Sequence, residues 1–301
     1  MNIIDVFNSF QTQEQAVEYL ETVRWKGKPV CPYCKGQKVG RHASGDRKGM
    51  RWQCFKCTRA FAVTVGTIFH GTHIPLRNWY LCIALMLNAK KSASAYQIAR
   101  DLGMRRPTVW SMMHRIRVAM ANDPEQFTLM HGIVEADETY IGASRRRGHR
   151  PPGIGGPPAK RGRGTDKKPV IGLMERGGRV VARPAKPGEL GSKGLSKFIE
   201  QHVDKAGTLL ITDEWRGYNR VKETMLHATV RHAVEYVNGI VHTNSIEGFW
   251  GLVKRAWYGS HHFYSEKYMS LYIAEACYKF NGRLGSSPSF DESLALFVNA
   301  K

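Results

Sequence analysis

The chain has 301 residues, of which 42% are hydrophobic and 10% aromatic, so it can fold into two or three domains and is not a disordered chain. Its 45 Lys and Arg residues exceed its 25 Asp and Glu residues, giving a net charge of +20. Because so much like charge repels itself unless a polyanion binds, nucleic acid is the leading partner. An anionic membrane surface is the alternative, but the sequence has no long amphipathic basic helix and no apolar run of about 18 residues.

Residues 1–28 predict a short helical segment at the N-terminus. Its apolar stripe consists of Phe7, Phe10, Ala16, Val17 and Leu20. The segment lacks the basic region followed by an apolar stretch that marks a secretory signal. We therefore expect a cytoplasmic protein associated with the nucleoid.

Residues 29–70 contain a paired cysteine motif. Cys31 and Cys34 form one CxxC, and Cys54 and Cys57 form a second. Each pair of thiolates can reach one tetrahedral Zn²⁺, and the segment between the pairs is long enough for a β-hairpin, so we expect a structural zinc ribbon. The alternative, a redox CxxC, belongs in a thioredoxin-like βαβ unit, which this sequence does not predict.

Residues 71–125 predict three helices, over 74–90, 92–103 and 105–120. The last two are joined by a turn centred on Gly103, which is the outline of a helix-turn-helix, with Pro107 at the first position of its second helix. An ordinary helical bundle is the alternative, and the net charge favours the DNA-binding interpretation. The residues expected to face DNA are Arg105, Arg106, Thr108, Ser111 and His114 or Arg115.

Residues 126–290 change to a β-rich pattern. Five strands are predicted, over 132–142, 169–177, 178–185, 208–215 and 228–234. A helix over 193–204 precedes the fourth strand, and another helix follows the fifth. This succession is that of a ribonuclease-H-like domain with a mixed sheet, so the expected fold class is multidomain α/β. Residues 291–301 are left as a C-terminal tail.

A basic insertion, residues 143–168, separates the first two strands. It contains nine Lys or Arg, one Asp and many Gly and Pro. Because it cannot bury an apolar core, we expect a mobile loop. A solvated loop without function is the alternative, but the density of arginine favours phosphate contact. The candidate contacts are Arg145, Arg146, Arg147, Arg161 and Arg163.

Two aspartates end apolar strands, Asp137 in IVEADETYIG and Asp213 in LLITDEWRGY. Either one alone is explained by a carboxylate that caps the following loop. Adjacent strands of one sheet would bring the two together, and carboxylates that close call for a cation. Oxygen ligands select Mg²⁺ or Mn²⁺, and two such ions about 4 Å apart support phosphodiester chemistry. The neighbouring Glu138 and Glu214 should point to the opposite faces of their strands.

The segment HTNSIEGFWGLVKR, residues 242–255, predicts an amphipathic helix. Its apolar face consists of Ile246, Phe249, Trp250, Val253 and, just beyond the segment, Trp257. Asn244 and Glu247 stand off that face and have two interpretations. They form a capping box, with Asn244 as N-cap and Glu247 at N3, or one of them binds a metal ion.

The cysteine motif, the helix-turn-helix outline, VEADETYIG, ITDEWRGY and HTNSIEGFWGLVKR together resemble bacterial insertion-sequence transposases of the DDE type, in their zinc-ribbon-containing, ISXO-like branch. The resemblance covers about residues 8–284. It implies a catalytic core with two metal ions that acts on terminal inverted repeats, with Asp137 and Asp213 as metal ligands. It also implies cleavage at the 3′ ends followed by attack of the freed 3′-OH on target DNA. Pairing two DNA ends implies a homodimer or a higher oligomer.

The resemblance leaves the third metal ligand open between Asn244 and Glu247. On a helical wheel Glu247 flanks the apolar face, beside Lys254, whereas Asn244 lies further round, and Glu247 adds the negative charge that Mg²⁺ prefers. We therefore expect Glu247 as the ligand and Asn244 as a helix cap or accessory ligand. Lys254 and Arg255 would hold phosphates of the DNA end.

His242 has two interpretations, a contact to the scissile phosphate or the end of the preceding strand. Two other functions also remain open for the whole chain. One is a non-catalytic, transposase-derived regulator that binds DNA, and the other is a metal-dependent nuclease that cuts without joining.

Overall fold

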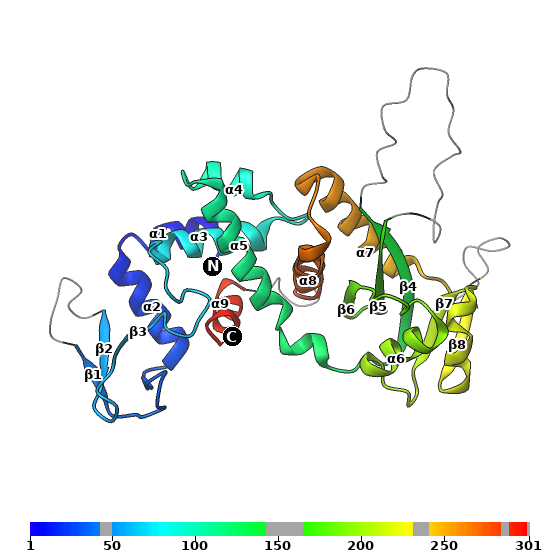
Figure 1. Ribbon diagram of the computed structural model, residues 1–301, viewed down its shortest axis with the longest axis horizontal. Helices are drawn as coiled ribbons and strands as arrows, with labels where there is room; N and C mark the ends of the chain where they lie inside the picture. Colours follow the sequence, from blue (N-terminus) through cyan, green and yellow to red (C-terminus); the bar gives the residue numbers. More distant parts are fainter. Residues whose placement is uncertain (43–49, 143–164, 166, 231–240, 284–288, 300–301) are drawn as a thin grey trace, which may run out of the picture. The chain divides into compact units, whose positions relative to one another are not determined.

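A computed structural model describes residues 1–42, 50–142, 165, 167–230, 241–283 and 289–299 of the chain (Figure 1). The chain forms two compact units: residues 1–123 with 286–301 make the first, and residues 124–285 make the second. The second unit is therefore inserted into the sequence of the first. None of the helices in the described ranges combines the length and apolarity that crossing a membrane requires.

The first unit contains six helices and a three-stranded sheet within the described residues. The helices are α1 (Ile3–Ser9), α2 (Gln13–Trp25), α3 (Leu76–Asn88), α4 (Ala95–Asp101), α5 (Arg106–Ala121) and α9 (Phe290–Asn299). The strands are β1 (Val39–Arg41), β2 (Arg51–Cys54) and β3 (Ala60–Ala62), and they form an antiparallel sheet in that order. All of these elements except α9 lie within the segments where the sequence predicted helices or a small sheet.

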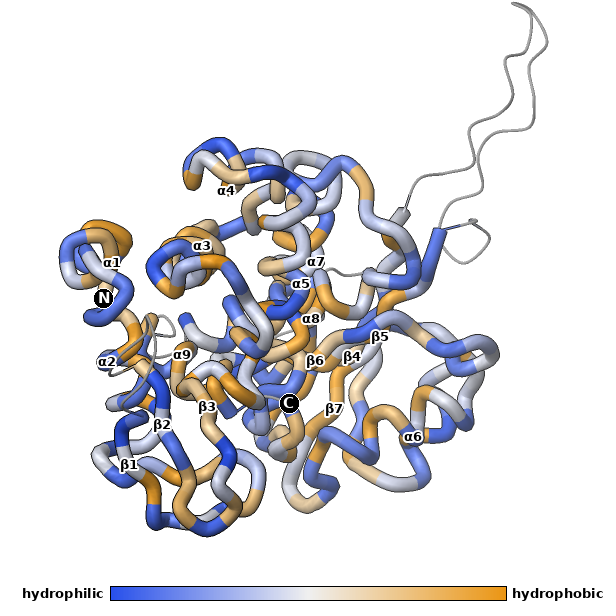
Figure 2. Tube along the Cα trace, turned by 60° about the vertical axis from the view of Figure 1, so that its left-hand side comes forward, coloured by the Kyte–Doolittle hydropathy of each residue, from blue (hydrophilic) through white to orange (hydrophobic). Residues whose placement is uncertain are grey.

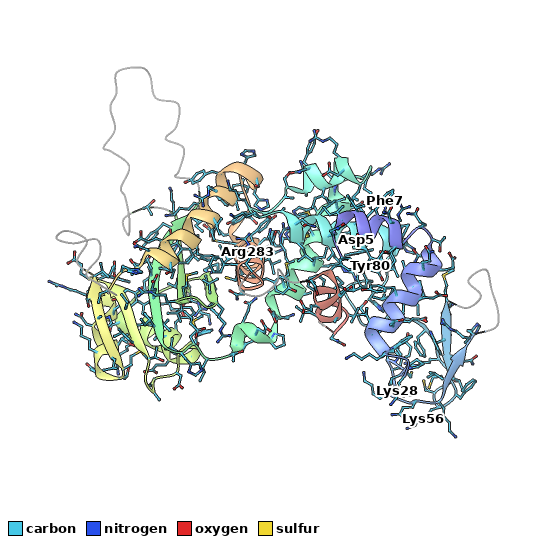
Figure 3. The ribbon with its side chains drawn as sticks, turned by 180° about the vertical axis from the view of Figure 1, so that it is seen from behind. Asp5, Phe7, Lys28, Lys56, Tyr80 and Arg283 are labelled. Carbon is cyan, nitrogen blue, oxygen red and sulfur yellow. The ribbon has the colours of Figure 1, made fainter. Side chains whose placement is uncertain are left out.

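The helical stripe predicted for the N-terminal segment is buried except for Phe7. Both α1 and α2 begin with a capping box, which fixes where each helix starts. Phe7 is 50% exposed, and the guanidinium of Arg77 lies 4.5 Å from its ring centroid. Tyr80 of α3 is fully buried instead, and its hydroxyl donates to the Ala16 carbonyl at 2.8 Å (Figure 3).

Residues 290–299 form a helix, although the sequence predicted a C-terminal tail over residues 291–301. Phe290, Leu294 and Phe297 are buried on one face of α9, which packs against α2, α3 and α5. The ring of Phe290 lies 5.6 Å from that of Tyr80. The apolar spacing i, i+4, i+7 explains why this short segment joins the core.

The turn between α4 and α5 has the geometry that the sequence predicted. Gly103 has φ +62°, a conformation that residues with a Cβ rarely adopt. The Met104 amide donates to the Ala99 carbonyl and the Gly103 amide to the Arg100 carbonyl, which closes α4 with a Schellman motif. The helix α5 then begins at Arg106, with Pro107 in its first turn.

The second unit is built on a mixed five-stranded sheet, as predicted. Its strands are β4 (Ile133–Ile141), β5 (Lys168–Glu175), β6 (Val180–Pro184), β7 (Leu209–Asp213) and β8 (Leu226–Val230). Their order is β6-β5-β4-β7-β8; β4–β5 and β5–β6 are antiparallel, whereas β4–β7 and β7–β8 are parallel. The helical elements are η1 (Pro124–Phe127), α6 (Ser192–His202), η3 (Arg216–Glu223), α7 (Asn244–Arg255), η4 (Ala256–His261) and α8 (Glu266–Asn281).

Helices cover both faces of this sheet. The strands β4, β6 and β7 themselves contain hydrophobic stretches (Figure 2). On one face, Val134 and Ala136 of β4 join a core with Leu195 and Phe198 of α6. On the other face, α7 and α8 form a second core with parts of β4, β5 and β6. Because side chains alternate along a strand, residues 135 and 137 of β4 belong to the α7 face. This alternation decides which side of the sheet carries the candidate site.

Candidate functional site

Asp137 and Asp213 lie on neighbouring parallel strands. The register of β4 and β7 pairs Glu135 with Ile211 and Ala136 with Thr212, so an aspartate comes next on each strand. Paired residues of a parallel ladder share a face of the sheet. The charge of Asp213 is one of the influences that raise the pKa of Asp137. The structure thus brings together the two carboxylates that the sequence analysis paired.

The carboxylate of Asp137 is held by α7. The indole Nε1 of Trp250 donates to Asp137 Oδ2 at 3.0 Å. The indole ring lies over Gly172, the residue paired with Asp137 on β5, and a Cβ at Gly172 would lie 2.6 Å from it. Only glycine at this position therefore lets Trp250 reach Asp137.

Burial is the main cause of an unusual titration at Asp137. Burial and then the charges of Glu138 and Asp213 raise the pKa of Asp137 to about 7. An unpaired carboxylate in this place is destabilising, and a bound cation would restore its ionised form. Asp213 is half-buried and accepts the Trp215 amide at 3.1 Å, which is the loop-capping contact that was the alternative for either aspartate alone.

Glu138 lies on the opposite face of β4, as the alternation predicted. The hydroxyl of Tyr218 donates to its Oε2 at 3.0 Å, and Tyr218 belongs to the core formed with α6. Glu214 follows Asp213 and is exposed.

The capping-box interpretation of α7 is wrong. The N-cap is Thr243, without a side-chain capping hydrogen bond, and Asn244 is the first residue inside the helix. The Thr243 hydroxyl donates to Glu247 Oε1 at 3.0 Å, so the glutamate does not turn back to a free amide. The predicted apolar face is confirmed, because Ile246, Phe249, Trp250, Val253 and Trp257 are all buried.

Glu247 lies one turn before Trp250 and is exposed. Within the described residues, three or more potential metal-binding atoms within 4.8 Å of one another occur at the four cysteines and not at the carboxylates. The structure therefore places Asp137 and Asp213 on adjacent strands, and Glu247 does not join them within 4.8 Å as a third metal-binding group. Glu247 lies on α7, the helix whose Trp250 contacts Asp137.

Glu135 is a site residue that the sequence analysis missed. Its side chain is fully buried on the α7 face of β4. Arg176 donates to Glu135 Oε1 from Nε at 3.0 Å and from Nη2 at 2.8 Å. The Ser245 hydroxyl and the Ile246 amide also donate to this carboxylate, each at 3.0 Å. Glu135 thereby provides the acceptor that Thr243 does not supply at the start of α7.

His242 belongs to the same network. Its Nδ1 lies 3.6 Å from Glu135 Oε1, and Arg176 Nη2 donates to its carbonyl at 2.9 Å. The ring is thus engaged with buried groups next to α7. Lys254 and Arg255 are exposed in the last turn of that helix.

The residues at and after the start of α5 that were expected to face DNA fall into two groups. Arg105, Arg106 and Ser111 are exposed, and Thr108 is half-buried. Arg115 differs, because its Nη2 donates to the His70 carbonyl at 2.7 Å and its guanidinium lies 5.4 Å from the Trp79 ring centroid. His114 is buried. The last two residues of the predicted set are therefore engaged with the first unit itself.

The basic insertion falls mostly outside the described residues, and with it Arg145, Arg146, Arg147, Arg161 and Arg163. Its final residues are placed. Lys168 is the first residue of β5, so this strand begins one residue earlier than predicted. Its Nζ forms an ion pair with Glu266 at 3.0 Å. Lys167 Nζ lies 3.3 Å from the hydroxyl of Tyr258.

The four cysteines of the predicted ribbon converge on one point. The Sγ atoms of Cys31 and Cys57 are 3.7 Å apart, and those of Cys34 and Cys54 are 3.5 Å apart. A tetrahedral zinc with Zn–S bonds of about 2.3 Å requires S–S separations of about 3.8 Å. The backbone amide of Cys57, with that of Lys56, lowers the pKa of Cys54 to about 7, which favours a thiolate. The donor set and spacing fit a zinc ion.

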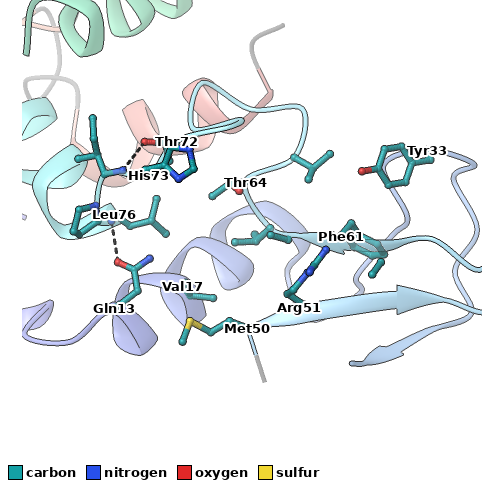
Figure 4. A pocket seen from close by; sticks show the side chains of 16 residues that line it. Gln13, Val17, Tyr33, Met50, Arg51, Phe61, Thr64, Thr72, His73 and Leu76 are labelled. Atoms are coloured by element: carbon teal, nitrogen blue, oxygen red, sulfur yellow. Dashed lines mark hydrogen bonds between the residues drawn. The ribbon is translucent and has the colours of Figure 1, made fainter. Parts of the chain in front are cut away.

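A pocket of about 560 Å³ lies in the first unit beside β3 (Figure 4). Gln13 of α2 is one of the lining residues, and its side-chain oxygen accepts a hydrogen bond from the Leu76 amide at 3.0 Å. The described residues that line it include no carboxylate and no cysteine. We therefore place the candidate chemistry in the second unit.

Two protein-family models match the chain, one over the cysteine cluster and one over the sheet that carries the aspartates. A family model for an ISXO2-like transposase domain matches residues 129–281, and one for a transposase zinc-ribbon domain matches residues 11–60. The chain is also similar to an uncharacterized protein in transposable element ISH50 of Halobacterium salinarum. The two are 28% identical over 279 residues, which cover 88% of this chain and 90% of that protein.

Two solved structures are similar at 13% identity. The similarity to the Mos1 strand transfer complex has a TM-score of 0.30 and extends over 71% of this chain and 72% of the chain in that complex. A pre-cleavage Mos1 transpososome has a TM-score of 0.28, with 73% and 78% covered. TM-scores of this size establish no shared arrangement.

Proposed function

Because the chain belongs to the ISXO2-like transposase family, we propose that it is the transposase of an insertion sequence. It binds the terminal inverted repeats of its element, cleaves the DNA strands and joins the freed 3′-OH to target DNA. One observation carries the proposal: Asp137 and Asp213 occupy neighbouring positions on two adjacent parallel strands. Burial disfavours the ionised form of Asp137 and raises its pKa, so a bound cation would stabilise that carboxylate. A DNA-binding regulator would have no use for two carboxylates brought together in this way.

Asp137 and Asp213 are proposed to bind Mg²⁺ or Mn²⁺, two ions per site, with Glu247 as the third ligand and Asn244 as an accessory ligand. Oxygen donors of this kind suit hard divalent cations. When bound, such ions activate the attacking oxygen and stabilise the leaving oxygen. The chain orients Asp137 through Trp250, and the Thr243 hydroxyl holds Glu247 on the adjacent turn of α7.

DNA contacts are proposed in both units. In the first unit, α4 and α5 act as a helix-turn-helix whose exposed Arg105, Arg106 and Ser111 face the duplex, with Thr108 beside them. In the second unit, Lys254, Arg255 and the basic insertion hold phosphates, and His242 orients the start of α7. The ribonuclease-H-like core would work as a homodimer or higher oligomer, because two DNA ends must be joined.

Cleavage and joining of labelled DNA that carries the terminal repeat tests this proposal. We expect wild type to cut and join in Mg²⁺, and Glu247→Gln to lose both steps by a factor of at least about 100 while still binding the repeat. Asn244→Ala is the matched variant on the same helical turn and should keep most activity.

The other outcomes separate the alternatives. Loss of activity in Asn244→Ala with activity retained in Glu247→Gln would move the third ligand to Asn244. A wild type that cuts but never joins would be a nuclease. Binding of the repeat without cleavage in any divalent metal would indicate a regulator and contradict the proposal.

The cysteine cluster is proposed to hold a structural zinc ion. Among the described residues of the ribbon, the small core fully buries only Cys31, Cys54 and Phe61, which is too little to fold three short strands without a metal. We expect about one zinc per chain by mass spectrometry of the metal, and none in Cys34→Ser. Cys82→Ala alters a buried cysteine outside the cluster and should keep its zinc. Equal zinc contents in both variants would contradict the assignment.

A further inference from the structure

The chain leaves α7 through an unusual turn. The segment η4 is a π-helix, and His262, which follows it, has φ +58°. Turns of the π type are rare and are frequently found at functional sites. Buried aromatic rings hold the turn: Trp257 and Tyr264 pack edge to face with centroids 4.3 Å apart, and Tyr264 stacks on Tyr272 at 4.2 Å. The backbone of this segment is therefore fixed by its own core.

Two aromatic side chains of the same segment face solvent. Tyr258 is 58% exposed and Phe263 is 67% exposed. They lie beside Trp257 and Tyr264 in the sequence, which are buried, so the turn presents some rings outward while it buries others. A rigid aromatic surface of this kind loses little conformational entropy when a flat ligand stacks on it.

Positively charged residues lie close to Tyr258, one in contact with it and two shortly before it in the sequence. Lys254 and Arg255 are exposed in the turn of α7 that leads into η4. Lys167 contacts the Tyr258 hydroxyl and directly precedes β5. Glu266 is exposed nearby in sequence, but Lys168 neutralises it. Aromatic rings among lysines and arginines are typical of sites that bind single-stranded nucleic acid, because bases stack on the rings and phosphates pair with the cationic side chains.

We propose that Tyr258 and Phe263 form a stacking surface for unpaired bases at the end of the DNA strand, an inference that rests on the proposed function. The surface continues from the C-terminal turn of α7, the helix that contacts Asp137 through Trp250. A strand whose phosphodiester lies at the aspartates would thus have its neighbouring bases received by the rings and its phosphates by Lys254 and Arg255.

Binding to two probes of arbitrary sequence tests the surface without requiring cleavage. One probe is a blunt labelled duplex, and the other is the same duplex with an unpaired thymidine tail of about eight nucleotides. At one fixed salt concentration, wild type should bind the tailed probe more tightly. Tyr258→Leu and Phe263→Leu should each weaken binding to the tailed probe about tenfold and leave the blunt probe nearly unchanged.

Two further variants make the result specific. Phe127→Leu removes another ring of the second unit, 68% exposed, and should behave as wild type. Tyr258→Phe keeps the ring without the hydroxyl and should keep the preference for the tail. Equal loss in Tyr258→Phe, or an undiminished preference in both leucine variants, would overturn the stacking surface. A change in the mass of the free protein in the leucine variants would show a contact between copies instead. A wild type that bound neither probe would overturn the stacking surface, and one that also failed to bind the terminal repeat would contradict the proposed function itself.

Discussion

Replacing Asp137 by asparagine is expected to raise the stability of the metal-free protein while abolishing DNA cleavage. The pKa of Asp137 is raised to about 7 in the folded chain, whereas an unfolded aspartate titrates near 3.9. An acid with a raised pKa costs stability as the pH rises from about 4 to about 7, because the folded state disfavours the charge. The difference corresponds to at most about 4 kcal/mol above pH 7. Asparagine removes the charge and still offers an oxygen to the Trp250 indole.

Thermal unfolding in chelator, followed over pH, measures this effect. Near pH 4 we expect wild type and Asp137→Asn to have similar Tm values, and above pH 7 the variant should be more stable by several degrees. Adding Mg²⁺ or Mn²⁺ should raise the Tm of wild type but not that of the variant, because the ion offsets the buried charge.

Asp204→Asn serves as the control, because Asp204 is partly exposed and pairs with His131 at 3.3 Å. It should keep both the pH dependence and the metal response of wild type. An Asp137→Asn protein that is less stable than wild type above pH 7, or that gains as much from Mg²⁺, would contradict a cation site at this carboxylate.

The elements around the site could be predicted from local pattern. Alternation in IVEADETYI places Asp137 on one face of a strand and Glu138 on the other, and the structure keeps both assignments. The apolar spacing from Ile246 to Trp257 likewise predicted which face of α7 is buried. These patterns depend on neighbours within a few residues, so the sequence contains them directly.

The contacts that organise the site depend on residues far apart in the chain. The sequence offered Asn244 and Glu247 as a capping box because the spacing fits, but the first turn of α7 uses Glu135, more than a hundred residues earlier. The alternation of β4 was a usable signal, since it places Glu135 on the same face as Asp137, where a buried charge requires a partner. The partner, Arg176, follows β5 and could be identified only once the pairing of β4 with β5 was known.

Replacing Glu135 by alanine is expected to destabilise the protein by about 3–5 kcal/mol, because it leaves the guanidinium of Arg176 without its carboxylate. The side chain of Glu135 is 0% exposed and that of Arg176 is 21% exposed, so water replaces the lost contacts poorly. The Ser245 hydroxyl and the Ile246 amide lose their acceptor as well. Glu135→Gln keeps the shape and one acceptor, and should cost about 1–3 kcal/mol.

Denaturant unfolding combined with hydrogen exchange of α7 distinguishes this role from that of an ordinary ion pair. Glu189→Ala breaks a second two-point contact, with Arg183 at 2.6 Å, that involves no residue of α7. It should cost less, and it should leave exchange at the start of α7 unchanged, whereas Glu135→Gln should accelerate exchange of the Ile246 amide. Since α7 carries Trp250 and Glu247, Glu135→Gln should also slow cleavage although it touches neither aspartate. Unchanged exchange in α7 would show that Glu135 stabilises the strand alone and does not position the helix against Asp137.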